Sequence, residues 1–195
     1  TLGIVKNKTI DGKSSDRALH TLIFDDPECR PFYYKNGKSF KDYHKEGEIF
    51  WHKYVTYTEG MSDYWDYSFF NVSVIRYADV LLLYAECLND KGETTEAINI
   101  INKVRARVNV PALPLTMSKA EVLKHLQDKE RPCELALEGS RWYDLVRWGI
   151  VEETLKAHNK PFVENYVDTK HQLFPIPHSE FLLNPDWEQN PNYSK

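Results

Sequence analysis

Apolar positions begin to recur at helical spacing at Val74 and continue to a turn at Gly92. Apolar or small side chains three and four positions apart indicate the buried face of an amphipathic helix. Gly92 is suited to end this helix, because glycine adopts the left-handed conformation without strain. The residues expected on the buried face are Tyr77, Val80, Leu81, Tyr84, Ala85 and Leu88.

A second run of the same kind follows after a short link, with Thr94 or Thr95 as its expected cap. Two helices joined this closely are expected to pack as an antiparallel hairpin. Such a hairpin is similar to one tetratricopeptide-type repeat, although a single copy is a weak repeat signal. The apolar face of the second helix comprises Ala97, Ile98, Ile100, Ile101, Val104 and Val108.

A third helix is predicted to begin at Ser118, since Ser118 and Glu121 form a capping-box pattern. Pro132 is expected to interrupt this helix, because proline lacks the amide donor and clashes with the preceding turn. The helix then resumes and ends at Gly149. The tail is rich in Pro and Asn and is expected to run extended, with one turn of helix after Pro177.

Residues 1–73 lack this periodicity and form a loop-rich, aromatic-rich segment, in contrast to the helical region 74–195. The run 53–58 alternates weakly, which is compatible with a strand. The sequence therefore predicts a mainly α fold with long irregular loops and at most one short β-hairpin. Both regions are expected to belong to one folding unit. The N-terminal half of that unit is expected to be missing from this sequence.

Composition narrows the possible partners and chemistry. The 195 residues have a formal net charge of −4, so a basic face for nucleic acid or an anionic membrane is not expected. Three cysteines do not make a disulfide framework, and the seven histidines show no metal-ligand spacing. No run is long enough for a membrane span. We expect no catalytic residue, no metal and no cofactor.

The stretch EGSRWYDLVRWG, from Glu138 to Gly149, concentrates tryptophans, arginines and carboxylates. On a helix, Glu134, Glu138 and Arg141 would be neighbours. One interpretation is a carboxylate pair for acid–base catalysis. The favoured interpretation is a paired charge network among packed aromatic rings, because buried charges need partners. We therefore assign this stretch to the core.

The aromatic residues of the first third lie among Gly, Asn, Asp and Ser, outside any long periodic run. Tyr and Trp combine a flat apolar ring with a polar edge, which suits stacking on sugar rings. That these rings instead anchor loops onto the helices is an equally open alternative. Trp65 is the preferred platform, and Trp51 is second because the run around it indicates packing. The candidate ligand-binding residues are Tyr33, Tyr34, Trp51, Asp63, Tyr64, Trp65 and Asp66.

Four segments occur in the order typical of a known family: VIRYADVLLLYAECLND, AINIINKVRARVNVP, ERPCELALEGSRWYDLVRWG and LFPIPHSEFLLNPDWEQNPNY. Together they resemble the C-terminal portion of SusD/RagB-type outer-membrane nutrient-binding lipoproteins. The departures are local: Pro132 stands where the family usually has Arg, Ser140 where His is common, and Asn192 where Gly is usual. The resemblance implies SusD-like, tetratricopeptide-like helical hairpins in a protein that is not an enzyme.

The same resemblance implies a surface-exposed protein of a Bacteroidetes outer membrane, held by a lipid anchor outside this chain. The leading hypothesis is non-catalytic glycan binding and delivery to a SusC-type TonB-dependent transporter. The alternative is a helical-repeat scaffold that binds a peptide or protein partner. An enzyme is the third possibility, with two loop carboxylates in a cleft, either Asp63 with Asp66 or Glu46 with Glu48.

Overall fold

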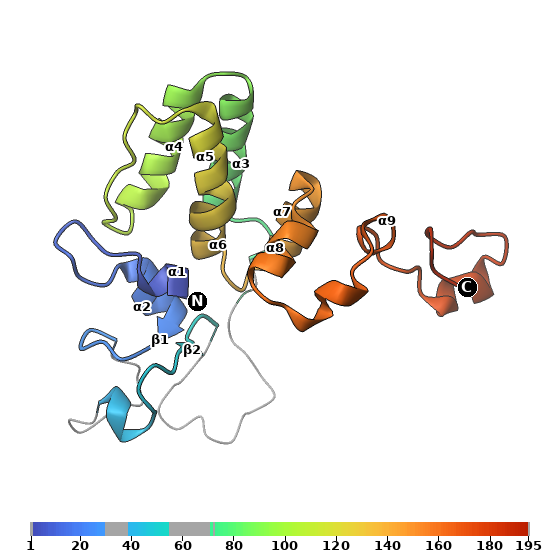
Figure 1. The fold of residues 1–195 in the computed structure, drawn as a ribbon, viewed down its shortest axis with the longest axis horizontal. Helices are drawn as coiled ribbons and strands as arrows, with labels where there is room; N and C mark the ends of the chain where they lie inside the picture. The colour runs from blue at the N-terminus through green and yellow to red at the C-terminus, as the bar shows by residue number, and fades with distance from the viewer. Residues whose placement is uncertain (1, 30–38, 55–70, 72, 195) are drawn as a thin grey trace. The chain divides into compact units, whose positions relative to one another are not determined.

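The computed structural model describes residues 2–29, 39–54, 71 and 73–194, and Figure 1 shows their helices and strands. By its internal contacts the chain divides into two compact units, Thr1–Glu138 and Gly139–Lys195. This division follows packing, whereas the expected boundary at residue 73 followed composition and stays a prediction. The mainly α fold with only a small sheet is confirmed.

Helices α3 (Tyr77–Asp90) and α4 (Thr94–Ala106) form the predicted hairpin. The turn between them contains Gly92 with a φ of 90°, a conformation that residues with a Cβ atom rarely adopt. Thr94 begins the second helix instead of capping it, since Glu93 occupies the cap position. Helix α5 (Lys119–His125) packs against both helices, and Figure 1 shows it in front of the hairpin that they form.

Helix α3 buries a different face from the one expected. Ala85 and Leu88 are buried as predicted, but their companions are Ala78 and Leu82. The prediction was wrong for the residues that lie exposed on the opposite side of the helix: Tyr77, Val80 and Tyr84. Helix α3 is apolar around most of its circumference, so two stripes at helical spacing compete, and α4 packs on the one made of alanines and leucines.

The capping box at the start of α5 is confirmed. The Ser118 hydroxyl accepts a hydrogen bond from the Glu121 amide, and the Glu121 carboxylate accepts one from the Ser118 amide at 2.7 Å. These two bonds satisfy amide donors that would otherwise lack a partner at the helix start.

Pro132 does not interrupt the helix, so that prediction was wrong. The chain remains helical from α5 through a π-helical turn, η2 (Leu126–Glu130), into α6 (Arg131–Glu134). Pro132 lies in the first turn of α6, and the wider π turn directly before it accommodates its ring and its missing amide donor. The interruption comes later, between α6 and α7 (Arg141–Trp148), where Leu137 and Gly139 have positive φ.

Residues 2–29 and 39–54 contain short elements that the polar, turn-rich pattern did not indicate. These are helix α1 (Leu2–Val5), helix α2 (Asp16–Thr21) and a 3-10 turn, η1 (Phe40–Asp42). Strand β1 (Leu22–Ile23) pairs antiparallel with strand β2 (Phe50–Trp51). The expected strand lay slightly further on, but Lys53 and Tyr54 form a turn, and 55–58 lie outside the described residues.

A network of ion pairs centred on two buried carboxylates joins this N-terminal part to the helices that follow it. Arg17 of α2 donates to Glu130 and to Glu134, both at 2.8 Å, and all three side chains are at most 2% exposed. Arg105 of α4 donates to Glu130 at 2.7 Å. Arg76 donates to Glu134 at 2.8 Å. Arg107 donates to the same carboxylate oxygen at 2.8 Å.

The unit Gly139–Lys195 has its own small core of Leu145, Val151 and Leu155. Helix α7 ends at Gly149, as predicted, with a φ of 67°. One helix after Pro177 was predicted, and α10 (His178–Leu183) confirms it. The further short helices of this unit are α8 (Val151–Ala157), η3 (Pro161–Asn165) and α9 (Asp168–His171). In the described ranges of the chain, no helix is long and apolar enough to cross a membrane.

Glu130→Ala is expected to lower the free energy of unfolding by about 3–5 kcal/mol, because it leaves Arg17 and Arg105 in the interior without a shared carboxylate. Urea denaturation followed by circular dichroism measures this loss. Lys124→Ala is the control, since it removes an exposed ion pair with Asp128 and should cost at most about 1 kcal/mol. Equal losses in the two variants would contradict the role of the buried network.

Stability is also expected to depend on the ionisation of Glu130. Burial alone would raise the pKa of this carboxyl, but the hydrogen bond with His125 and the charges of Arg17 and Arg105 outweigh it and lower the pKa to about 2. Its contribution is therefore full above the ordinary value of 4.5 and is lost as pH falls towards about 2. Urea midpoints measured across this window should fall more steeply for the unmodified protein than for Glu130→Ala.

Candidate functional site

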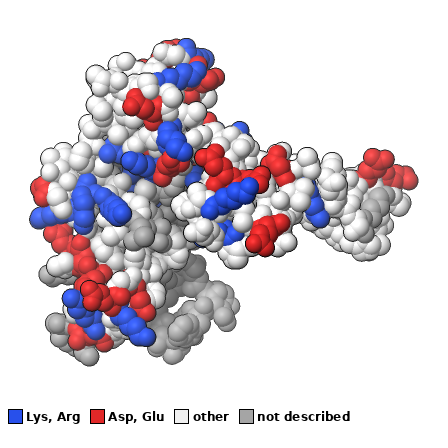
Figure 2. Space-filling model, in the orientation of Figure 1, with Lys and Arg blue, Asp and Glu red and all other residues white. Residues whose placement is uncertain are grey.

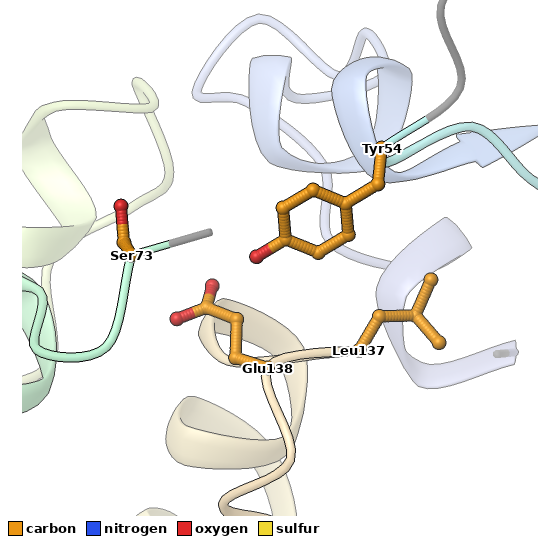
Figure 3. Close-up of a pocket in the computed structure, with 4 residues that line it drawn as sticks. All are labelled: Tyr54, Ser73, Leu137 and Glu138. Atoms are coloured by element: carbon orange, nitrogen blue, oxygen red, sulfur yellow. The ribbon is translucent and has the colours of Figure 1, made fainter. Parts of the chain in front are cut away.

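A pocket of about 210 Å³ lies in the unit Thr1–Glu138 where three separate parts of the chain meet. We call it the Tyr54 pocket. Tyr54 follows strand β2, Ser73 precedes helix α3, and Leu137 and Glu138 follow helix α6. In Figure 3 the Tyr54 ring spans the opening with its hydroxyl directed towards Glu138, and Ser73 lies across from it. The pocket thus combines one aromatic ring, two hydroxyl groups and one carboxylate.

The Glu138 carboxylate is fixed by two cations. It accepts a hydrogen bond from Arg76 Nε at 2.9 Å and another from the ammonium group of Lys53. Lys53 also donates to the carbonyl of Ala136 at 3.0 Å, which ties the segment after β2 to the end of α6. Burial alone would lower the pKa of Arg76, but its bonds to Glu138 and Glu134 raise that pKa, so the guanidinium stays charged.

Backbone strain is concentrated around this pocket. Tyr54 and Leu137 have φ values of 66° and 63°, in the left-handed region that costs a non-glycine residue about 1–2 kcal/mol. In the described part of the chain, the other non-glycine residues with positive φ are asparagines, which tolerate this conformation. Strained residues persist where the surrounding structure holds them, and they often mark functional sites.

The pocket is suited to binding a polyhydroxylated ligand. Hydroxyl groups of a ligand can donate to the Glu138 carboxylate in charge-assisted hydrogen bonds. The face of the Tyr54 ring can contact C–H groups, while its hydroxyl can bond at the edge. Within the ranges that the structure describes, no group of three His, Cys, Asp or Glu side chains could hold a metal ion.

A second pocket, of about 320 Å³, lies within the unit Gly139–Lys195. The rings of Tyr166 and His171 stack at 5.7 Å, and His171 meets Tyr193 edge-on at 6.5 Å. Burial and the hydrogen bond to Asp168 raise the pKa of Tyr166 to about 12, so its hydroxyl stays protonated. The residues lining this pocket are Trp142, Leu155, Phe162, Asn165, Tyr166, His171, Leu173, Phe174 and Tyr193.

Charge is distributed without a large field of one sign on the face drawn in Figure 2. Basic and acidic side chains are interspersed there among uncharged ones. A polyanion such as a nucleic acid duplex binds to clustered basic side chains, so this face offers it no extended contact.

Of the predicted ligand-binding residues, the structure describes Trp51 alone. Its side chain is 41% exposed although it lies in strand β2 opposite Leu22, so the ring is accessible rather than packed away. The other candidates lie outside the described residues and stay predictions: Tyr33, Tyr34, Asp63, Tyr64, Trp65 and Asp66. Tyr54 and Ser73 line the Tyr54 pocket. The sequence between them contains four of these candidates, namely Asp63, Tyr64, Trp65 and Asp66.

Sequence reasoning assigned Glu138 to a charge network and overlooked its place at a pocket. The pairing of Glu134 and Glu138 with cations is confirmed, but their partners Arg17, Arg76 and Lys53 come from distant parts of the sequence. Helical spacing had suggested Arg141, which is half-buried and belongs to the unit Gly139–Lys195. Leu137 and Glu138 lie outside both α6 and α7, so helical spacing does not relate Glu138 to Arg141.

The fold and the Tyr54 pocket define a protein of the helical-hairpin class with a polar pocket beside its loops. The chain belongs to the SusD family, whose model matches residues 31–193. It is 37% identical to SusD-like protein P38 of Formosa agariphila over 63% of this chain and 25% of that protein. SusD-like protein P2 of the same organism is 31% identical over 63% of this chain and 26% of its own length.

A solved structure gives the same result. The SusD superfamily protein from Bacteroides vulgatus superposes with a TM-score of 0.77 at 29% identity, over 98% of this chain and 42% of that one. The chain therefore spans about a quarter of the curated relatives it matches and less than half of this solved relative. The family and the SusD-like fold expected from the sequence are confirmed.

The strain at Leu137 can be measured directly. Leu137→Gly should be more stable than Leu137→Ala by about 1 kcal/mol, because both remove the side chain beyond Cβ and only glycine is free of strain at this φ. The measurement is the difference in urea unfolding free energy. The same pair of substitutions at Leu115, which is exposed and has no positive φ, should not favour glycine. A preference for alanine at Leu137 would contradict the strained backbone.

Proposed function

We propose that this chain is part of a protein that captures glycans at the bacterial cell surface without chemically altering them. The observation on which this rests is membership of the SusD family over residues 31–193. The protein would be lipid-anchored to the outer membrane through a segment outside this chain. It would deliver its ligand to a SusC-type TonB-dependent transporter.

The chemistry of the Tyr54 pocket supports this proposal. Glu138 is held by Lys53 and Arg76, so it presents a carboxylate whose position does not depend on the ligand. A group fixed before binding loses little conformational entropy when a ligand arrives, and this favours binding of weakly interacting sugars. Tyr54 and Ser73 add hydroxyl groups on the two sides of the opening.

The predicted platform at Trp65 is compatible with the Tyr54 pocket. Residues 55–72 connect Tyr54 to Ser73 in the sequence, so Trp65 belongs to the segment that joins two residues lining the pocket. We therefore propose that the Tyr54 pocket takes one sugar unit and that Trp65, with Asp63, Tyr64 and Asp66, contacts a neighbouring unit. Trp51 is the exposed described ring closest in sequence to Tyr54 and is an additional stacking surface.

The direct test is isothermal titration calorimetry of the complete polypeptide against α-glucans, β-glucans, xylans, mannans and pectins. We expect binding of at least one class, with no release of shorter products on prolonged incubation. Turnover of a glycan by the pure protein would exclude the non-catalytic role. Failure to bind any of these glycans, together with binding of unstructured peptides, would favour the helical scaffold instead.

Aromatic substitutions then locate the site. Tyr54→Ala and Trp65→Ala should each weaken glycan binding by about 1–3 kcal/mol, by analogy with the loss of one ring stacked on a nucleic acid base. Trp65→Ala should leave the melting temperature unchanged. Tyr143→Ala is the matched control, because it removes an exposed ring in the unit Gly139–Lys195 and should leave affinity unchanged. Unaltered affinity in both test variants would contradict this location.

A further inference from the structure

The charge that lines the Tyr54 pocket is a carboxylate. Among the described residues that line it, Glu138 is acidic, and none of the other three is a lysine, an arginine or a histidine. Figure 3 shows the Glu138 carboxylate directed into the space between the Tyr54 hydroxyl and Ser73. A ligand that enters the pocket therefore meets a fixed negative charge first.

The two cations that hold this carboxylate are bound to protein acceptors and do not line the pocket. Lys53 Nζ donates to Glu138 and, at 3.0 Å, to the carbonyl of Ala136. Arg76 donates to Glu138 through Nε at 2.9 Å, and to the carboxylate and the carbonyl of Glu134 through its other two nitrogens at 2.8 and 2.9 Å. The cations thus compensate the charge of Glu138 without offering themselves to a ligand.

The Glu138 carboxylate retains the capacity to accept further hydrogen bonds. A carboxylate has about four acceptor sites, two on each oxygen. In the described structure Oε1 accepts from Lys53 and Oε2 accepts from Arg76, so one site remains on each oxygen. Two adjacent hydroxyl groups of a sugar ring can donate to the two oxygens of one carboxylate, and such charge-assisted bonds are roughly twice as strong as neutral ones.

We propose that the Tyr54 pocket selects an uncharged sugar unit that donates two adjacent hydroxyl groups to Glu138, and that it discriminates against charged sugars. This inference rests on the proposed glycan capture and names the class of glycan. A sugar carboxylate has no hydrogen to donate at neutral pH, and it would be repelled by Glu138, because like charges brought together across an interface are unfavourable. A sugar ammonium group gains little, because Lys53 and Arg76 already compensate this carboxylate.

The test compares oligosaccharides that share a linkage and differ in charge. Cellohexaose, maltohexaose and mannohexaose are paired with derivatives in which C6 is oxidised to a carboxylate. An oligogalacturonide is paired with its carboxyl-reduced form. Isothermal titration calorimetry of the complete polypeptide at low ionic strength measures both members of each pair. In each pair that binds, we expect the neutral member to bind at least about tenfold more tightly, because the repulsion acts at short range.

The outcomes separate this inference from the proposed function. Equal or tighter binding of the carboxylated members would overturn the selection of uncharged sugars and leave glycan capture intact. Tighter binding of a glucosamine hexamer than of cellohexaose would also overturn it. Absence of binding by every oligosaccharide would overturn glycan capture, and the selection with it.

Two variants attribute the selection to Glu138. Glu138→Gln keeps the shape of the side chain and removes its charge, so the ratio of affinities within a pair should fall below about threefold. Ser73→Lys introduces a cation across the pocket from Glu138 and should lower the ratio in the same way; Ser73 is exposed and lies outside the helices, so this variant leaves the ion pairs of Glu138 in place. Ser179→Lys is the matched control, because Ser179 is exposed and does not line the pocket. An unchanged ratio in Ser73→Lys would overturn the inference even if Glu138→Gln fails to fold.

Discussion

The pairing of the buried Glu130 and Glu134 with arginines from distant segments is the interaction on which the rest of the structure depends. Both carboxylates are almost fully buried and lie one turn apart along the continuous helical run from α5 to α6. Each ion would be costly in the interior alone. Arg17, Arg76 and Arg105 come from three separate parts of the chain. The charges are compensated only when all these parts are in place, so the network fixes α2, α4 and the start of α3 relative to α6.

The π-helical turn has a defined role in this network. In a π turn the hydrogen bonds link residues five apart, and His125 and Glu130 are five apart with His125 Nε2 2.9 Å from the carboxylate. The same turn makes room for Pro132, which would otherwise disrupt the helix directly before Glu134. One irregularity therefore accommodates the proline and adds a partner to the most buried carboxylate. π turns of this kind are frequent where a helix has a specific task.

The pocket is an extension of this network. Arg76 bridges Glu134, in the network, and Glu138, at the pocket. The orientation of Glu138 therefore follows from the position of the buried helix rather than from flexible loop residues. Lys53 brings the turn with Tyr54 to the same carboxylate. Residues from three regions of the sequence thus meet at one point because a charge deep in the core must be compensated.

The sequence predicted the features that depend on neighbouring residues, namely the hairpin of α3 and α4, the capping box at Ser118 and the stop at Gly149. It did not predict the pairing of Glu138 with Lys53 and Arg76, because long-range ion pairs have no local signature. For the same reason it did not locate the two strands of the short sheet, which are distant in the sequence.

The wrong prediction of which face of α3 is buried has a different cause. Apolar residues recur at helical spacing on two faces of this helix. A prediction that assumes a single buried face cannot distinguish between them. Local sequence preferences generally agree with the fold, so an apolar stripe on a helix is expected to pack against another surface. Tyr77, Val80 and Tyr84 satisfy the pattern of a core and lie outside the core formed by the described residues. Helical spacing therefore identified the helix but could not decide which of its two apolar faces packs against α4.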